Sequence, residues 1–243
     1  MRIDKRKANQ LRPVSFERQV SEFAEGSCLM KCGHTHVLCT ASVKKQVPRW
    51  RKPEDGGWIT AEYDMLPRAN RERSNRSAGR NGRSQEISRL IGRSFRAVAD
   101  LSQLPGLTIT IDCDVLQGDG GTRTTAVTGG YLALVDALRH CLDLGLIEKI
   151  PLRDSVVGVS VGIVGGKALL DLCYEEDRDA DVDSNFVMTG GGKLIEVQMT
   201  GEETTFTPAQ LHELLALAGR GARQLTKMQR AIGDPVRFLR SRA

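Results

Sequence analysis

Strict alternation of apolar and polar residues marks the stretch LTITIDCDV at residues 107–115. Successive side chains of a β-strand point to opposite faces of the sheet, so every second residue faces the same way. The apolar residues, which predict a covered face, are Leu107, Ile109, Ile111, Cys113 and Val115. The polar residues between them are Thr108, Thr110, Asp112 and Asp114. The pattern predicts a strand with one buried face and one polar face.

Three other segments have the pattern of a β-hairpin, in which two apolar runs flank a glycine turn. The first covers residues 27–46, with Gly33 near the turn. The second covers 155–174 with two glycines at 165–166, and the third covers 185–200 with three glycines at 190–192. Two hairpins in succession argue against a purely parallel sheet, because hairpin strands are antiparallel.

Helical spacing of apolar residues appears over 83–99, where Ile87, Leu90, Ile91, Phe95 and Val98 share one face. A second helix is predicted over about 122–143. A third begins at Thr207-Pro208, an N-cap residue followed by proline, and runs to about 230. Residues 47–82 are polar and rich in Pro, Gly and Arg, which predicts a loop.

These elements together predict an α+β fold in which mixed β-sheets pack with α-helices. We expect a single domain over residues 1–232, followed by a C-terminal tail at 233–243. The length of 243 residues is sufficient for a sizeable core.

Composition excludes a membrane or secreted protein. No apolar run approaches the roughly 20 residues of a membrane span, and the basic N-terminus lacks the apolar region of a secretory signal. We therefore expect a cytoplasmic protein that does not contact membranes. Its six cysteines should then be mostly free thiols.

Arginine is concentrated in one part of a chain whose formal net charge is +5. Nine arginines lie between Leu66 and Arg96, with no lysine and only two acidic residues, Glu72 and Glu86. The planar guanidinium fits phosphate oxygens with two hydrogen bonds, so this run favours a nucleic-acid partner over a solvated charged face.

The stretch QGDGGTRTTAVTGG at 117–130 places a glycine-rich turn between a strand and a helix. Helix N-termini expose unpaired backbone N–H groups that attract anions, and glycine lets a ligand approach the backbone. The stretch lacks the Lys of a Walker loop and the context of a dinucleotide fingerprint. It is the right size for a small phosphate, although a tight turn with a helix cap is the simpler alternative.

Four aspartates, Asp177, Asp179, Asp181 and Asp183, occupy every second position of DRDADVDSN. An EF-hand is excluded, because Val182 and Met188 stand where that loop requires Gly and Glu. The alternatives are a solvated acidic loop and a site in which two of the carboxylates hold one Mg²⁺ beside bound phosphates.

The group Cys28, Cys32, His34, His36 and Cys39 suggests a zinc site by composition. Alternation within a hairpin places these residues on different faces, however, and buried free cysteines are the more common arrangement. We find no Ser-His-Asp or Cys-His arrangement that would supply a covalent nucleophile.

Several long motifs, in order, carry a resemblance to a known family. They are NQLRPV (9–14), GWITAEYDMLPRA (57–69), GRSQEISRLIGRS (82–94), DCDVLQGDGGTRT (112–124), VSVGIV (159–164), the DLCYEED segment with its later aspartate and asparagine (171–185), and VMT with IEVQ (187–200). Nearly the whole chain resembles the RNase PH family, phosphate-dependent exoribonucleases that trim the 3′ ends of tRNA precursors. The resemblance implies an RNase PH-type fold and a homohexamer, a trimer of dimers.

The resemblance also implies roles for individual residues. Inorganic phosphate would be bound by Arg83, Gly121, Thr122 and Arg123. Asp177 and Asp183 would be the catalytic carboxylates and the Mg²⁺ ligands. Arg68, Arg73 and Arg76 are the candidates for contact with tRNA. The chain departs from the family pattern at Ser184, where methionine is usual, and Asp179 and Asp181 are additions of this sequence.

The implied reaction is phosphorolysis, in which inorganic phosphate attacks the 3′-terminal phosphodiester and releases a nucleoside diphosphate. Asp183 could instead serve as the general acid for the leaving 3′ oxygen. Three alternatives are a hydrolytic nuclease, a non-catalytic RNA-binding ring subunit and a fragment of a polyribonucleotide phosphorylase. The presence of both arginines, the Gly-Thr-Arg and both aspartates argues against the binding subunit.

Overall fold

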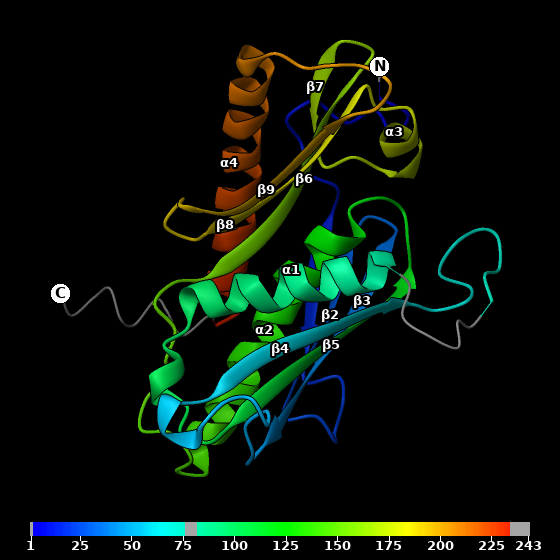
Figure 1. Cartoon of the computed structure of the whole chain (residues 1–243). Coiled ribbons are helices and arrows are strands. Elements are labelled where there is room, and N and C mark those ends of the chain that lie inside the picture. The colour runs from blue at the N-terminus through cyan, green and yellow to red at the C-terminus, as the bar shows by residue number, and fades with distance from the viewer. Residues whose placement is uncertain (1, 76–81, 234–243) are drawn as a thin grey trace.

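Two β-sheets lie one above the other and are joined by helices (Figure 1). The computed structural model describes residues 2–75 and 82–233. The first sheet has the order β1-β2-β3-β5-β4, and the second has the order β7-β6-β8-β9. In the first sheet β4 runs parallel to β5, whereas the other neighbours are antiparallel. The prediction of an α+β fold is confirmed, with a mixed first sheet and a second sheet whose pairs are all antiparallel.

The strands of the first sheet are β1 (Val14–Arg18), β2 (Gly26–Cys32), β3 (Thr35–Lys44), β4 (Trp58–Met65) and β5 (Thr108–Gln117). Those of the second sheet are β6 (Val156–Val164), β7 (Lys167–Leu170), β8 (Val182–Thr189) and β9 (Leu194–Gly201). The helices are α1 (Gly82–Val98), α2 (Thr122–Asp143), α3 (Tyr174–Arg178) and α4 (Pro208–Ala231), with short 3-10 turns η1 (Pro53–Asp55) and η2 (Leu101–Gln103).

Most of the predicted elements are confirmed. The alternation in β5 buries every apolar residue from Leu107 to Val115 and leaves the intervening polar residues half exposed. All three hairpins form, as β2–β3, β6–β7 and β8–β9. The three predicted helices correspond to α1, α2 and α4, and the side chain of Thr207 caps the last of them through the Gln210 N–H.

The prediction of a loop throughout 47–82 is wrong, because β4 lies within it. The strand does alternate, with Ile59, Ala61 and Tyr63 buried. Alanine and tyrosine give a weak apolar signal, and the surrounding Pro, Gly and Arg residues hide it. Pairing with β5 supplies the stability that this composition lacks.

The glycines of β6 allow the two halves of the chain to pack closely. A Cβ atom at Gly158 would lie 2.7 Å from Thr124 Cα in α2. On the opposite face of β6, Val159 packs beside Gly221 of α4. One continuous core of buried side chains therefore runs from the first sheet through α2 to β6 and α4.

The cysteine-histidine group is divided between faces as expected. Cys28, Cys32 and Cys39 are buried, whereas His34 is exposed and His36 is half exposed. All six cysteines are free thiols. Over the two described ranges, none of the helices combines the length and apolar character that a membrane crossing needs. The boundary at residue 232 stays a prediction, and residues 234–243 of the tail lie outside the described residues.

Because the Cβ of an alanine at Gly158 would overlap the backbone of α2, Gly158→Ala should lower the free energy of unfolding by about 1–3 kcal/mol. Denaturant titration measures this change. Gly219→Ala is the matched control, because a Cβ there meets only the end of the Arg223 side chain, at 3.5 Å. Equal stability of the two variants would contradict the close packing of β6 on α2.

Candidate functional site

The glycine-rich turn before α2 has a backbone conformation that requires glycine. Gly120 and Gly121 have φ angles of 70° and 63°, in the left-handed region that other residues rarely adopt. A Cβ at Gly120 would also lie 2.4 Å from the carbonyl oxygen of Leu172. The turn therefore fits against the segment after β7 and directs the first N–H groups of a 22-residue helix outward.

Thr122, the first residue of α2, is positioned by a hydrogen bond from the first sheet. The hydroxyl of Tyr63 in β4 donates a hydrogen bond to Thr122 Oγ1 at 2.8 Å, and both side chains are buried. Burial raises the pKa of Tyr63, which keeps this donor protonated. Tyr63 lies inside one of the quoted motifs, but no pattern in the sequence places it beside Thr122.

Arg123 is positioned by residues from two other elements. Its Nη1 donates to Gln198 Oε1 of β9 at 2.5 Å and lies 3.3 Å from Glu86 Oε2 of α1. Gln198 Nε2 in turn donates to Glu86 Oε1 at 2.7 Å. The guanidinium is about one-fifth exposed, so its charge is only partly screened by solvent.

Arg83 lies in the first turn of α1, and its side chain is exposed. Its charge, together with that of Arg123, acts on both Tyr63 and Asp177. The structure therefore brings Arg83 and the Gly-Thr-Arg of α2 near the acidic segment, although they are far apart in the sequence.

Asp177 and Asp183 come from different elements, α3 and β8, and both are substantially buried. Burial raises the pKa of Asp177, against the opposing charges of Arg83 and Arg123. Burial, and then the charge of Asp177, raises the pKa of Asp183 to about 6. The two carboxylates therefore share one electrostatic environment, which the arginines only partly neutralise.

The Asp183 carboxylate has one free acceptor. Asn185 Nδ2 donates to Asp183 Oδ2 at 3.3 Å, whereas the buried Oδ1 receives no hydrogen bond from the described residues. A buried acceptor without a donor fits a cation ligand. No larger group of three or more His, Cys, Asp or Glu side chains able to hold a metal occurs in the described part of the chain.

The other two aspartates of the run point elsewhere. Asp179 is exposed and pairs with the adjacent Arg178 at 2.7 Å. Asp181 is also exposed and accepts a hydrogen bond from the Gly166 N–H at 3.3 Å. The short helix α3 breaks the period-2 spacing, so the four carboxylates do not share a face.

The arginine-rich loop after β4 is exposed. Arg68 donates to the Arg71 carbonyl, and Arg73 donates to Asn75. Arg71 pairs with Glu175 of α3 at 2.6 Å and so ties this loop to the acidic segment. Arg76 lies outside the described residues.

A buried ion pair that sequence reasoning missed joins the N-terminal segment to the site. Arg12 Nη2 lies 2.6 Å from Asp171 Oδ1, and the Arg12 backbone N–H donates to Asp171 Oδ2 at 2.7 Å. Arg12 also donates to the carbonyls of Asp119 and Gly120 in the glycine turn. Although burial alone would raise the pKa of Asp171, the charge of Arg12 keeps it lowered. Both residues lie in the quoted motifs, but nothing in the sequence paired them.

A second buried pair fixes α3. Arg2 Nη2 lies 2.6 Å from Glu176 Oε2, and Arg2 also donates to the carbonyls of Leu170 and Asp171. Since Glu176 immediately precedes Asp177, this pair sets where the Asp177 backbone lies.

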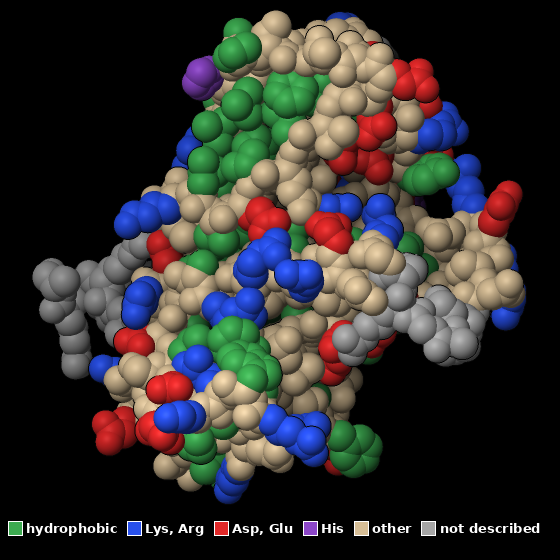
Figure 2. Space-filling view, in the orientation of Figure 1, with side chains coloured by type: hydrophobic (Ala, Val, Ile, Leu, Met, Phe, Trp, Pro, Cys, Tyr) green, Lys and Arg blue, Asp and Glu red, His purple; other side chains and the backbone are tan. Residues whose placement is uncertain are grey.

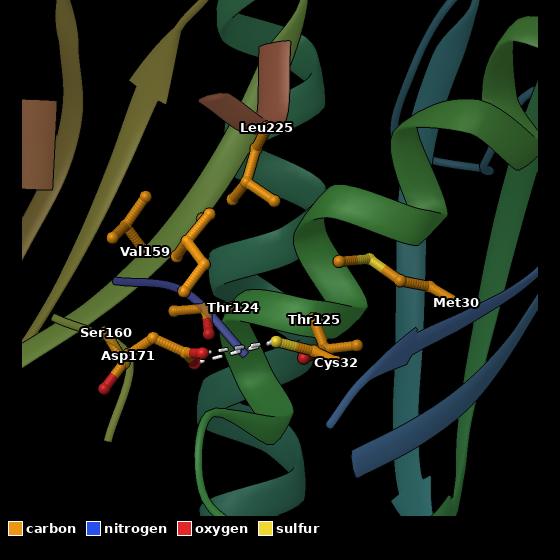
Figure 3. A pocket seen from close by; sticks show the side chains of 10 residues that line it. Met30, Cys32, Thr124, Thr125, Val159, Ser160, Asp171 and Leu225 are labelled. Carbon is orange, nitrogen blue, oxygen red and sulfur yellow. Dashed lines mark hydrogen bonds between the residues drawn. The ribbon is translucent and has the colours of Figure 1, made fainter. Parts of the chain in front are cut away.

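A small cavity of about 20 Å³ lies behind the glycine turn (Figure 3). The Cys32 thiol points across it toward the Asp171 carboxylate at 3.6 Å. This volume corresponds to about one water molecule. Arg83, Arg123, Asp177 and Asp183 do not line this cavity, so it is separate from those four residues.

Known proteins are similar to this chain over most of its length. Family models of the 3′ exoribonuclease family match twice, domain 1 over residues 10–139 and domain 2 over residues 154–221. The chain is 53% identical to Ribonuclease PH of Methylocella silvestris over 95% of this chain and 99% of that protein. It is also 53% identical to Ribonuclease PH of Corynebacterium efficiens, with 95% of both chains covered.

Solved structures show the same fold. An Archaeoglobus fulgidus exosome with RNA bound to the active site has a TM-score of 0.79 at 26% identity, covering 93% of this chain and 92% of that one. Rice Rrp46 has a TM-score of 0.78 at 21% identity, covering 94% and 98%, which shows the fold alone.

Removing Arg12 would leave Asp171 buried without its main partner, so Arg12→Ala should lower the free energy of unfolding by about 3–5 kcal/mol. Lys31→Ala is the control, since its pair with Glu17 is solvent-exposed and contributes about 0–1 kcal/mol. Thermal or denaturant unfolding measures both variants. Similar small losses in the two would show that the buried pair does not hold the turn.

Proposed function

Since this chain belongs to the 3′ exoribonuclease family, in its ribonuclease PH branch, we propose that its reaction takes place between α1, the start of α2, α3 and β8. The chain is a phosphate-dependent tRNA nucleotidyltransferase, which trims 3′-terminal nucleotides from tRNA precursors and releases nucleoside diphosphates. The observation that carries the location is the Gly-Thr-Arg at the N-terminus of α2, opposite two substantially buried carboxylates.

Inorganic phosphate binds, in this proposal, to Arg83, Gly121, Thr122 and Arg123. The glycine conformation opens the backbone to a close approach, and the first N–H groups of α2 add their partial positive charge. Arg123 is already oriented by Gln198 and Glu86, so little side-chain freedom is lost when phosphate binds. The arrangement places an anionic nucleophile in a fixed position.

Asp177 and Asp183 are the residues that would hold Mg²⁺. Two carboxylates suit this ion, which retains several waters and takes substrate phosphates as further ligands. The unpaired Oδ1 of Asp183 fits that role. When bound, the ion would neutralise charge on the scissile phosphate.

The chemical step transfers a nucleotidyl group. An oxygen of inorganic phosphate attacks the terminal phosphorus, the bond from phosphorus to the preceding 3′ oxygen breaks, and that oxygen takes up a proton. The alternative for Asp183 is that its carboxyl group, whose pKa is raised to about 6, donates this proton instead of holding the ion. No covalent enzyme intermediate is required, because positioning and charge stabilisation account for catalysis of this type.

The remaining proposals rest on the family resemblance. Arg68, Arg73 and Arg76 contact the tRNA, and the first two are exposed in the loop after β4. The chain assembles into a homohexamer, a trimer of dimers, and acts in the cytoplasm.

The proposed site is tested with a tRNA that carries a few extra 3′ nucleotides, incubated with Mg²⁺ in the presence and absence of inorganic phosphate. Nucleoside diphosphates should appear only with phosphate, and Arg123→Ala should abolish their release. Arg139→Ala, at the other end of α2, is the control and should retain activity. Monophosphates released without phosphate would mean that water is the nucleophile. Wild-type activity of Arg123→Ala would refute the proposed phosphate-binding site.

Asp183→Asn should lower kcat by roughly 100-fold or more, because the amide is neither an anionic metal ligand nor a carboxylic acid. Asp181→Asn is the matched control, two residues earlier and exposed, and should be fully active. Single-turnover rates with saturating phosphate measure both. Full activity of Asp183→Asn would show that the Asp183 carboxylate takes no part in catalysis.

A further inference from the structure

Both tryptophans of the chain lie together, at the end of the first sheet remote from the glycine turn. Trp58 begins β4 and is partly buried, whereas the Trp50 side chain is 67% exposed. Their rings meet edge to face, with centroids 4.8 Å apart and an interplanar angle of 89°. An exposed tryptophan supported in this way presents a large aromatic surface to solvent.

Arginines hold this aromatic pair in place. The Arg96 guanidinium lies 4.3 Å from the centre of the Trp58 ring, and its Nη1 donates to the Ile59 carbonyl at 2.8 Å. The Arg51 guanidinium lies 5.4 Å from the same ring and donates to the Asp55 carbonyl. These cation–π contacts and hydrogen bonds fix Trp58, and through it the position of Trp50.

Basic charge surrounds the pair and continues toward the site. Residues 44–55 include five basic side chains, Lys44, Lys45, Arg49, Arg51 and Lys52, against Glu54 and Asp55. Figure 2 shows Lys and Arg side chains gathered along α1 and around the start of β4. On α1 these are Arg89, Arg93 and Arg96, which are exposed or partly exposed. From Arg83 to Arg96 the helix axis spans about 20 Å.

We propose that Trp50 and the basic side chains of residues 44–52 form a docking platform for the body of the RNA substrate, away from its reacting 3′ end. Aromatic surfaces flanked by positive charge bind nucleic acid by base stacking and phosphate contact. The platform is separate from Arg68, Arg71 and Arg73, which follow the opposite end of β4. The inference rests on the proposed function for the identity of the ligand.

The experiment compares a long and a short substrate. A tRNA precursor can reach both the site and the platform. Stacked tetra-adenylate, at about 3.4 Å per residue, covers roughly 14 Å, which is less than the length of about 20 Å of α1 between Arg83 and Arg96. Trp50→Ala should raise KM for the precursor by at least about fivefold, the loss expected for one stacked base. Its kcat, and the kinetics with tetra-adenylate, should be those of the wild type.

Phe23→Ala is the matched control, because Phe23 is an exposed aromatic residue, 94% accessible, between Glu22 and Glu25 rather than among basic residues. It should leave both substrates unaffected. Lys52→Ala should make the salt dependence of precursor binding shallower, by about one unit of its slope.

Tryptophan fluorescence gives a readout that does not depend on catalysis. Because the two tryptophans of the chain are Trp50 in the platform and its ring partner Trp58, precursor tRNA added without phosphate should quench the emission. Trp50→Phe should bind with similar affinity but lose most of the quenching. Quenching without phosphorolysis would support RNA binding at the platform and refute the proposed function.

Three results would overturn the platform. The first is an unchanged KM for the precursor in Trp50→Ala, and the second is an equal loss with tetra-adenylate. The third is a change in the sedimenting mass of Trp50→Ala, which would assign this surface to contacts between copies of the chain.

Discussion

The buried ion pair between Arg12 and Asp171 is the interaction on which the site depends. A carboxylate removed from water is costly unless it is paired and hydrogen-bonded, so Asp171 requires the guanidinium and the backbone N–H of Arg12. The same guanidinium holds two carbonyls of the glycine turn. Asp171 itself lies six residues before Asp177 and has a φ angle of 58°, in the left-handed region. One charge pair thus sets the distance between the turn that is proposed to bind phosphate and the segment that carries the carboxylates.

Electrostatic balance explains why the site uses so many charges. Phosphorolysis brings two anions together beside two carboxylates, and each carboxylate is already less acidic than in water because it is buried. Arg83 and Arg123 oppose that penalty, but Asp183 keeps a pKa of about 6, which indicates an incomplete balance. A site left with excess negative charge and an unpaired oxygen favours the entry of a cation.

The sequence predicted the elements whose patterns are local. Alternation in β5, glycines at the hairpin turns and the Thr207 cap each depend on residues within a few positions of one another. The strand β4 was missed because its stability comes from β5, more than 40 residues away. Family motifs predicted roles for Arg83, Arg123, Asp177 and Asp183, and these stay predictions. No pattern in the sequence indicated that Tyr63 supports Thr122 or that Arg12 pairs with Asp171. Such pairs join residues 59 and 159 positions apart, and only the folded chain brings them together.

The continuous core has a consequence for how the enzyme handles successive nucleotides. Because α2 packs against both sheets, with Gly158 in contact with its first turn, a hinge motion between the two halves of the chain would have to break this packing. The groups proposed to bind phosphate and metal come from both halves and therefore keep their spacing throughout a cycle of removal. It is then the RNA that advances by one residue after each cleavage, past a fixed point of reaction.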